Sequence, residues 1–261
     1  MSDPVAHEIY AIKYADHDRR ASENFLGGDP HDGPMPLDYF VWLVRGEGLE
    51  VVVDTGFNAA AAARRQRRLV RPVDAALSLL GVQAQSVREV IITHLHYDHV
   101  GNFDLFPRAT FHLQDLEMQY ATGRCMCHEP MRYAFDVEDV VGMVRNVYTG
   151  RVRFHAGDAQ VAPGLSVHLI GGHTMGLQAV RVATRRGHVV LASDASHFYA
   201  NMDQARPFPI VYNVADMMEG WGRLRALADS DAHVVPGHDP LVLERYPAPS
   251  GELQGIVARL D

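Results

Sequence analysis

Cysteine, basic residues and long apolar runs are all scarce in this sequence of 261 residues. Its two cysteines, Cys125 and Cys127, are separated by a single residue, which makes a mutual disulfide geometrically awkward, so no disulfide framework is expected. No stretch of about eighteen apolar residues occurs, and the N-terminus lacks an apolar segment behind a basic start, so neither a membrane span nor a secretion signal is predicted. We therefore expect a soluble, cytoplasmic protein without a membrane partner.

Positive charge is in deficit. The chain carries 24 Lys and Arg against 32 Asp and Glu, which gives a formal net charge of -8 at pH 7. Because proteins that bind DNA or RNA need a basic surface, nucleic acid is not expected as a partner. The one basic run, Arg64, Arg65, Arg67 and Arg68, follows an alanine tract and is interpreted as the solvated face of a helix, not as an anion site. The oligomeric state is left open, with a homodimer as one option.

Apolar sequence, by contrast, is sufficient for a sizeable core, since hydrophobic residues make up 47% of the chain. A layered α/β architecture commonly reaches this length as one unit, so we predict a single domain over residues 1–261. β-branched runs predict strands at 39–44, 49–53, 87–93, 165–170, 179–183, 188–192 and 232–235. Helix-like segments lie at 58–69, 72–80, 113–120, 137–147 and 215–228. Interleaved strands and helices favour an α/β fold.

Two segments between these elements have distinct compositions. Residues 45–48 contain two glycines, which suit a hairpin turn, so part of the sheet should be antiparallel and a purely parallel, doubly wound sheet is disfavoured. Residues 123–136 show no clear period, and long irregular insertions in compact domains are often functional. We interpret this second segment as a substrate-facing lid that supplies an apolar wall. Its apolar members are Met126, Met131, Tyr133 and Phe135.

The densest chemical signal is Thr93-His94-Leu95-His96-Tyr97-Asp98-His99, which has four potential metal ligands within six residues after an apolar strand. His94 and His96 lie two residues apart at a strand end and can point to the same side. The following turn can bring Asp98 and His99 to a neighbouring point, so one segment could serve two metal ions. Without such a role, four polar residues after a buried strand would be costly, because unpaired buried polar groups are destabilising.

Three further potential ligands each follow an apolar run later in the chain. His173 lies in Gly-Gly-His-Thr, Asp194 in Ala-Ser-Asp-Ala and His238 in Pro-Gly-His-Asp. Glycines near strand ends let the backbone turn tightly and present a side chain into a cleft. Imidazole and carboxylate groups without thiolate suit zinc and are also compatible with other divalent first-row metals. Zinc is therefore the first expectation.

With its ligands in this order, the chain resembles the metallo-β-lactamase superfamily, whose signature is H-x-H-x-D-H followed by a distant His, an Asp and a final His. The resemblance extends over essentially the whole chain and implies an αββα sandwich of four layers that holds two zinc ions. By the resemblance, one ion would be held by His94, His96 and His173. The other would be held by Asp98, His99 and His238, and Asp194 would bridge the two.

Within the superfamily the chain is most similar to the N-acyl homoserine lactonases, through residues 172–174, 193–196 and 236–239. These enzymes usually carry a tyrosine three residues after the bridging Asp, and this chain has His197 there, with Tyr199 two residues further on. By the resemblance, His197 or Tyr199 would donate a hydrogen bond to the developing oxyanion of the substrate. An imidazole there, with an ordinary pKa of about 6.5, would add a titration in mildly acidic solution.

Other residues have weaker claims to the site. Asp54, in Val53-Asp54-Thr55-Gly56, resembles part of an early strand-loop motif of the superfamily and would orient the metal site, although a plain turn explains it equally well. His112 and His128 could line the cleft, but surface or core positions are favoured for both. Cys125 and Cys127 could bind zinc, but seven better ligands are already in place.

The implied reaction is hydrolysis of a lactone or a similar small acyl substrate. A hydroxide held between two metal ions would attack the carbonyl carbon, and Asp98 would pass a proton to the leaving group. Rival activities on this scaffold are those of a glyoxalase-II-like thioesterase, a β-lactamase, a phosphodiesterase and a di-iron oxidoreductase. His96 in place of a glutamate argues against the redox enzymes, and the acidic charge argues against an RNA-processing nuclease. A protein that only sequesters an acyl ligand is the non-enzymatic alternative.

Overall fold

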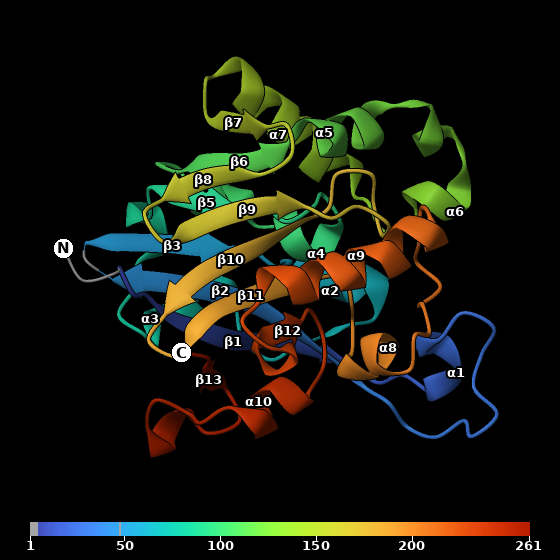
Figure 1. Cartoon of the computed structure of the whole chain (residues 1–261). Helices are drawn as coiled ribbons and strands as arrows, with labels where there is room; N and C mark the ends of the chain where they lie inside the picture. The colour runs from blue at the N-terminus through green and yellow to red at the C-terminus, as the bar shows by residue number, and fades with distance from the viewer. Residues whose placement is uncertain (1–4, 47) are drawn as a thin grey trace.

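The computed structural model describes residues 5–46 and 48–261 (Figure 1). Its strands are β1 (Glu8–His17), β2 (Leu37–Gly46), β3 (Leu49–Val53), β4 (Arg68–Leu69), β5 (Glu89–Ile91), β6 (Thr110–Gln114), β7 (Val152–His155), β8 (Ala159–Ala162), β9 (Leu165–Leu169), β10 (Gln178–Thr184), β11 (Gly187–Ser193), β12 (Val234–Pro236) and β13 (Val257–Arg259). Its α-helices are α1 (Ala21–Asn24), α2 (Ala59–Arg65), α3 (Val73–Ser78), α4 (Tyr97–Val100), α5 (Asp115–Thr122), α6 (Glu129–Arg132), α7 (Val137–Tyr148), α8 (Tyr199–Asp203), α9 (Val214–Leu227) and α10 (Leu241–Arg245).

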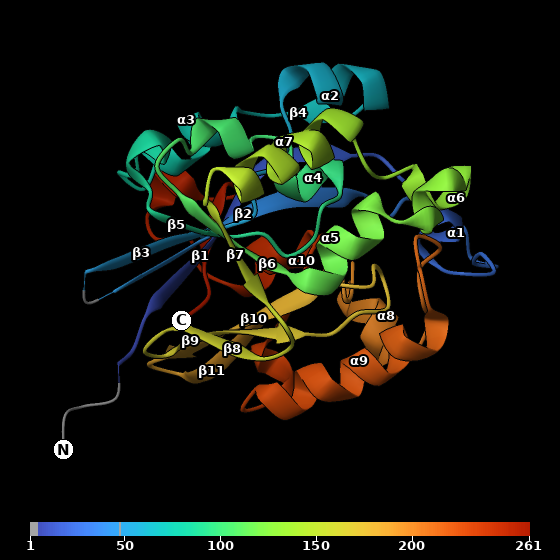
Figure 2. The same ribbon diagram turned by 90° about the horizontal axis from the view of Figure 1, so that it is seen from above.

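The strands form two mixed sheets. The first has the order β13-β1-β2-β3-β5-β6-β7, with β4 paired to β1; β3, β5, β6 and β7 are parallel and the rest antiparallel. The second has the order β12-β11-β10-β9-β8 and is antiparallel except for β11 and β12. The sheets pack face to face, with α2, α3 and α7 outside the first and α9 outside the second (Figure 2). The predicted αββα sandwich is confirmed.

Three apolar layers hold the sandwich together. β2 contributes to two of them, because side chains alternate between the faces of a strand. Val41 and Leu43 pack under the helices, whereas Phe40 and Trp42 pack against the second sheet. On the outer face of the second sheet, α9 packs through Trp221. Full burial of one such large apolar side chain stabilises the fold by about 1.5–3 kcal/mol, so the layers fix the sheets against each other.

Four strands end at the segments that carry the predicted metal ligands. β5 leads into the histidine-rich segment, β9 into the loop with His173, β11 into Asp194 and β12 into His238. Ser193 lies opposite Pro236 in the parallel pair of β11 and β12, so the chain leaves both strands side by side. β9 runs in the same direction as β11, because both pair antiparallel with β10. Three ligand segments therefore start from one edge of the second sheet.

All the predicted strands and helices have counterparts, but their boundaries and number differ. β2 and β3 form the predicted antiparallel hairpin, although Glu47 of its turn lies outside the described residues. The helix predicted at 113–120 begins only at Asp115, because Leu113 and Gln114 pair with β7. Residues 123–136 are more regular than predicted, with a 3₁₀ turn at Arg124–Cys127 followed by α6. None of the described helices is long and apolar enough to cross a membrane.

The interpretation of the basic run as one helix face was wrong. α2 ends at Arg65 because Gln66 adopts a left-handed conformation (φ 55°). The chain then continues as β4, where Arg68 pairs with Asp16 of β1. Arg64 and Arg65 therefore lie on α2, Arg68 lies on β4, and Arg67 lies between these two elements.

Candidate metal centre

The seven predicted metal ligands converge on one buried cluster. Their side chains fall into overlapping groups whose ligating atoms lie within 4.8 Å of one another. These groups are His94, His96 and His173; His94, His99 and Asp194; and Asp98, His99 and His238. A fourth group joins His173 and Asp194 to His197, which is not one of the seven. The fold thus assembles the whole set that the sequence predicts.

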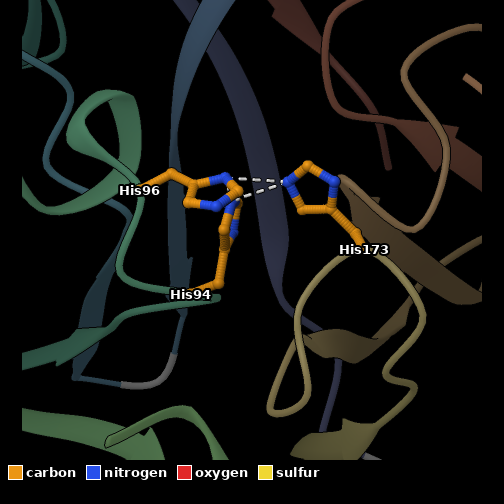
Figure 3. A group of neighbouring side chains, drawn as sticks. All are labelled: His94, His96 and His173. Carbon is orange, nitrogen blue, oxygen red and sulfur yellow. Dashed lines mark hydrogen bonds between the residues drawn. The ribbon is translucent and has the colours of Figure 1, made fainter. Parts of the chain in front are cut away.

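His94, His96 and His173 form the first half of the cluster (Figure 3). His173 Nε2 lies 2.9 Å from His96 Nδ1 and 3.2 Å from His94 Nε2, and these last two atoms lie 3.0 Å apart. The His173 Nδ1–H donates to the carbonyl oxygen of Ile210 (2.6 Å), which can only accept, so Nε2 presents a bare lone pair. Three nitrogens that face one another in this way cannot all be satisfied by hydrogen bonds, whereas one shared cation satisfies all three.

Asp98, His99 and His238 form the second half. Asp98 Oδ2 lies 3.5 Å from His99 Nε2 and 3.7 Å from His238 Nε2. The His238 Nδ1–H donates to the carbonyl oxygen of Asp38 (2.9 Å), so its Nε2 also presents a lone pair. This half combines two imidazoles with one carboxylate.

Asp194 lies between the two halves. Its Oδ1 is 3.0 Å from His238 Nε2 and 3.3 Å from His99 Nε2 in the second half. Its Oδ2 is 3.4 Å from His173 Nε2 and 3.9 Å from His94 Nε2 in the first half. One carboxylate therefore faces both candidate metal positions with different oxygens.

The electrostatics of the cluster fit divalent cations. Burial opposes charge on these groups, yet His238 and His99 keep the pKa of Asp194 well below its usual range, so the carboxylate is ionised. In return, against the effect of burial, Asp194 and Asp98 raise the pKa of His99 well above its usual value. His99 Nε2 and Asp194 Oδ1 nevertheless have no hydrogen-bond partner among the described residues. A metal ion at this point would replace the proton and satisfy both atoms.

Asp54 forms hydrogen bonds to His99 and to Thr93, beside the cluster. Its Oδ2 accepts a hydrogen bond from His99 Nδ1 (2.7 Å), and its Oδ1 accepts one from the Thr93 N–H (2.8 Å). The residue itself has a left-handed backbone (φ 62°), which costs energy for a side chain other than glycine. Its contact with a ligating histidine favours the orienting role over a plain turn.

Two residues of this support were missed by the sequence analysis. The Thr93 hydroxyl lies within hydrogen-bond distance of Asp54, of His94 Nδ1 (3.2 Å) and of the Ser193 hydroxyl (2.9 Å). Glu117 on α5 is fully buried and accepts hydrogen bonds from the Leu95 N–H (2.8 Å) and the Thr174 hydroxyl (2.6 Å). It thereby ties the two loops of the first half together, and burial raises its pKa to about 7. In the sequence, only the position of Thr93 directly before His94 indicated a role at the site, and nothing indicated one for Glu117.

His197 lies in the cluster, but its ring N–H already forms a hydrogen bond to Asp194. Its Nε2 is 2.9 Å from Asp194 Oδ2, which can only accept, so the proton sits on Nε2. Its ring stacks on Phe208, with centroids 3.6 Å apart. Burial lowers the pKa of His197 to about 3, below the mildly acidic range of the titration expected from the sequence, which stays a prediction. The geometry favours a role in holding Asp194 over donation to the substrate.

The structure does not bring Tyr199 to the cluster. Its side chain belongs to the apolar layer between the sheets, and the Arg245 guanidinium lies 3.8 Å from its ring centroid. It borders a different surface cavity, together with Met202 and Arg225. Of the two residues, the geometry therefore supports His197, and not Tyr199, as a member of the site.

Three neighbouring cavities, all bordered by Tyr133, define the cleft. A small one of about 40 Å³ lies over the cluster and is bordered by Tyr97, Tyr133 and Arg67. An apolar one of about 560 Å³ is lined by the predicted lid segment, including Met126 and Phe135. A basic one of about 630 Å³ shares Tyr133 and Arg67 with the small cavity. The apolar wall thus lies beside the candidate metal centre.

The remaining candidates lie outside the cleft. His112 pairs with Glu89 (2.8 Å) and stacks on His155, and His128 is exposed. Met131 accepts a hydrogen bond from the Tyr120 hydroxyl instead of lining the apolar cavity. Neither cysteine belongs to a group of clustered potential metal ligands within the described part of the chain.

Known proteins to which the chain is similar include a probable metallo-hydrolase and lactonases. A sequence profile described as "Metallo-beta-lactamase superfamily" matches residues 35–238, which include all seven ligands. A probable metallo-hydrolase of Mycobacterium tuberculosis is 26% identical over 226 residues, covering 78% of this chain and 72% of that protein. The N-acyl homoserine lactonase AttM of Azorhizobium caulinodans is 27% identical over 182 residues, covering 64% and 63%. The crystal structure of a quorum-quenching N-acyl homoserine lactone lactonase has the same fold, with a TM-score of 0.75 and 22% identity over 92% of this chain and 94% of that one.

Proposed function

The chain belongs to the metallo-β-lactamase superfamily, and on that premise we propose that it is a dinuclear zinc hydrolase that opens a lactone, such as an N-acyl homoserine lactone, or a similar small acyl ester. The observation that carries the proposal is the buried cluster of seven ligands with Asp194 between its halves. Resemblance to lactonases supports the substrate class, since one such relative is 27% identical to the chain.

The distances between the seven candidate ligands divide them between two metal positions. His94, His96 and His173 would hold one ion, Asp98, His99 and His238 would hold the second, and Asp194 would touch both. Two divalent ions there would supply an activated water as nucleophile and polarise the substrate carbonyl. A set of imidazoles and carboxylates without thiolate is the reason for zinc as the first choice.

The side chains around the ions have separate tasks. The Asp98 carboxylate borders the small cavity, where it would accept a proton at one oxygen and return it to the leaving alkoxide. His197 would hold Asp194 Oδ2 through its Nε2–H. The Asp54 carboxylate would keep His99 Nδ1 protonated, so that Nε2 stays free to bind metal. Phe135, whose ring centroid lies 4.6 Å from that of His96, would exclude water from one side.

A substrate panel tests the proposal. Acid release would be measured with N-acyl homoserine lactones, simple lactones, a thioester, a β-lactam and a phosphodiester, together with elemental analysis of the protein. We expect two zinc ions per chain and preferential lactone hydrolysis that a chelator abolishes and added zinc restores. Preference for the thioester would point to the glyoxalase-II-like alternative. Tight binding of the lactone without turnover would make the protein a sequestering one.

A further inference from the structure

Basic residues gather at one side of the cleft in a chain whose formal charge is -8. The cavity of about 630 Å³ is bordered by four arginines and a single acid, Glu23. The arginines are Arg19, Arg64, Arg65 and Arg67. Two of them, Arg19 and Arg67, also border the small cavity over the metal ligands. The positive charge therefore adjoins the candidate reaction centre directly.

Two of these arginines have no carboxylate within 4.0 Å among the described residues. Arg65 donates to the carbonyl oxygens of Tyr133 (2.9 Å) and Phe135 (3.0 Å). Arg67 donates to the Tyr97 hydroxyl (3.1 Å), to the carbonyl oxygen of Arg65 (2.6 Å) and to His17 Nε2 (3.0 Å), none of which is a carboxylate. Its Nη2 makes no hydrogen bond to a described residue, so its two N–H donors remain available.

The other charges at the cavity are already paired. Arg64 forms an ion pair with Asp136. The Glu23 carboxylate accepts a hydrogen bond from the Arg20 N–H (2.8 Å) and lies 3.9 Å from Arg19 Nε. Burial, with a smaller contribution from the nearby Arg67 and Arg19, lowers the pKa of His17 to about 4.

The unpaired guanidiniums are held in fixed positions. Arg65 stacks on the Tyr97 ring at 3.9 Å from its centroid, and Tyr97 lies between two metal ligands in the sequence. The Tyr97 hydroxyl in turn lies 3.3 Å from that of Tyr39. A guanidinium that is oriented in advance loses little entropy when it binds, and its planar fork matches a carboxylate or a phosphate.

We infer that the basic cavity binds an oxyanion carried by the substrate itself, so that the enzyme prefers lactones or acyl esters with a negatively charged substituent. The inference rests on the proposed function and narrows its substrate class. Arg67 would make the main contact through Nη2, with Arg65 and Arg19 contributing charge. The apolar cavity, which Tyr133 also borders, would remain for an uncharged acyl portion.

The test compares two substrates that differ chiefly in charge: a five-membered lactone with a carboxylate substituent, and the methyl ester of that carboxylate, with opening of the lactone ring as the measured reaction. With the zinc-loaded protein, we expect a higher kcat/KM for the carboxylate, declining as salt is added. Arg67→Gln should lower kcat/KM for the carboxylate by roughly 10- to 100-fold, mainly through KM, as loss of a charged hydrogen bond does, and change the methyl ester little. A second pair with a phosphate substituent decides which oxyanion fits better.

Arg68→Gln is the matched control. It removes the same charge from the same run, but Arg68 is exposed, pairs with Asp16 and does not border the cavity, so both substrates should keep their rates. Equal losses for both substrates in Arg67→Gln would mean that Arg67 only supports Tyr97, and equal wild-type rates for the two substrates would also overturn the inference.

A binding measurement separates this inference from the proposed function. If neither lactone is hydrolysed, the function fails. Calorimetric titration of the wild type and Arg67→Gln with the carboxylate lactone then still decides the inference: weaker binding by the variant supports it, and equal or absent binding overturns it.

Discussion

The floor and the mouth of the cleft are built in opposite ways. The floor consists of buried imidazoles and carboxylates whose outer nitrogens and oxygens are fixed by partners such as Asp54, Asp38 and Ile210. The mouth is formed by partly or largely exposed groups, among them Arg67 and Tyr133, which is 63% exposed. A change in the floor should therefore alter metal binding and the rate on every substrate, whereas a change in the mouth should alter which substrates are preferred.

The floor and the mouth should also differ in the free-energy cost of losing a hydrogen-bond partner. Floor side chains are surrounded by other polar groups in a dry environment, so removal of one leaves another unsatisfied at a cost of about 1–3 kcal/mol. Side chains of the mouth can turn to water instead. Three substitutions test this comparison, in order of decreasing effect.

The largest effect is expected for Asp194→Asn, because one amide cannot face both metal positions with anionic oxygens. We expect loss of metal and of activity beyond the 10- to 100-fold that removal of an outer partner typically costs. Elemental analysis and rates at saturating zinc provide the measurement. Full activity with one ion or none would contradict the two-metal floor.

His197→Ala should have the next largest effect, since it removes the hydrogen bond on Asp194 Oδ2. We expect roughly a 10- to 100-fold loss in metal affinity, with the rate falling in parallel. His197→Gln, which can donate to the same oxygen, should recover part of the loss. A fall in kcat with metal affinity unchanged would instead return His197 to the role of donor to the substrate carbonyl.

The smallest effect is expected from the mouth, for Met126→Ser combined with Tyr133→Ser. Loss of contact equal to two methylene groups, at about 0.8 kcal/mol each, would weaken binding of long acyl chains by roughly tenfold. Metal content and the rate on a short-chain lactone should stay the same. An unchanged preference for chain length would mean that residues 123–136 form only a surface segment.

Much of the fold could be predicted because the apolar strands of the core have clear patterns. β2 is buried on both faces from Leu37 to Val44, and it was found as the continuous apolar run at 39–44. Short strands such as β7 and β8, with Arg153 and Gln160 on their exposed sides, were missed because neighbouring strands stabilise them more than their own composition does. The end of α2 was missed for a similar reason, since pairing of β4 with β1 overrides the helical pattern.

The candidate metal ligands were predicted from the sequence alone. His94 to His99 form a local motif, and His173, Asp194 and His238, which each follow an apolar strand, complete the order of ligands in the family that the chain resembles. The tertiary structure decided what surrounds them. Glu117, the orientation of His197 toward Asp194, the distance of Tyr199 and the unpaired Arg67 depend on contacts between segments far apart in the chain. Such contacts leave no local pattern, because only close packing of the folded chain determines which polar groups find partners.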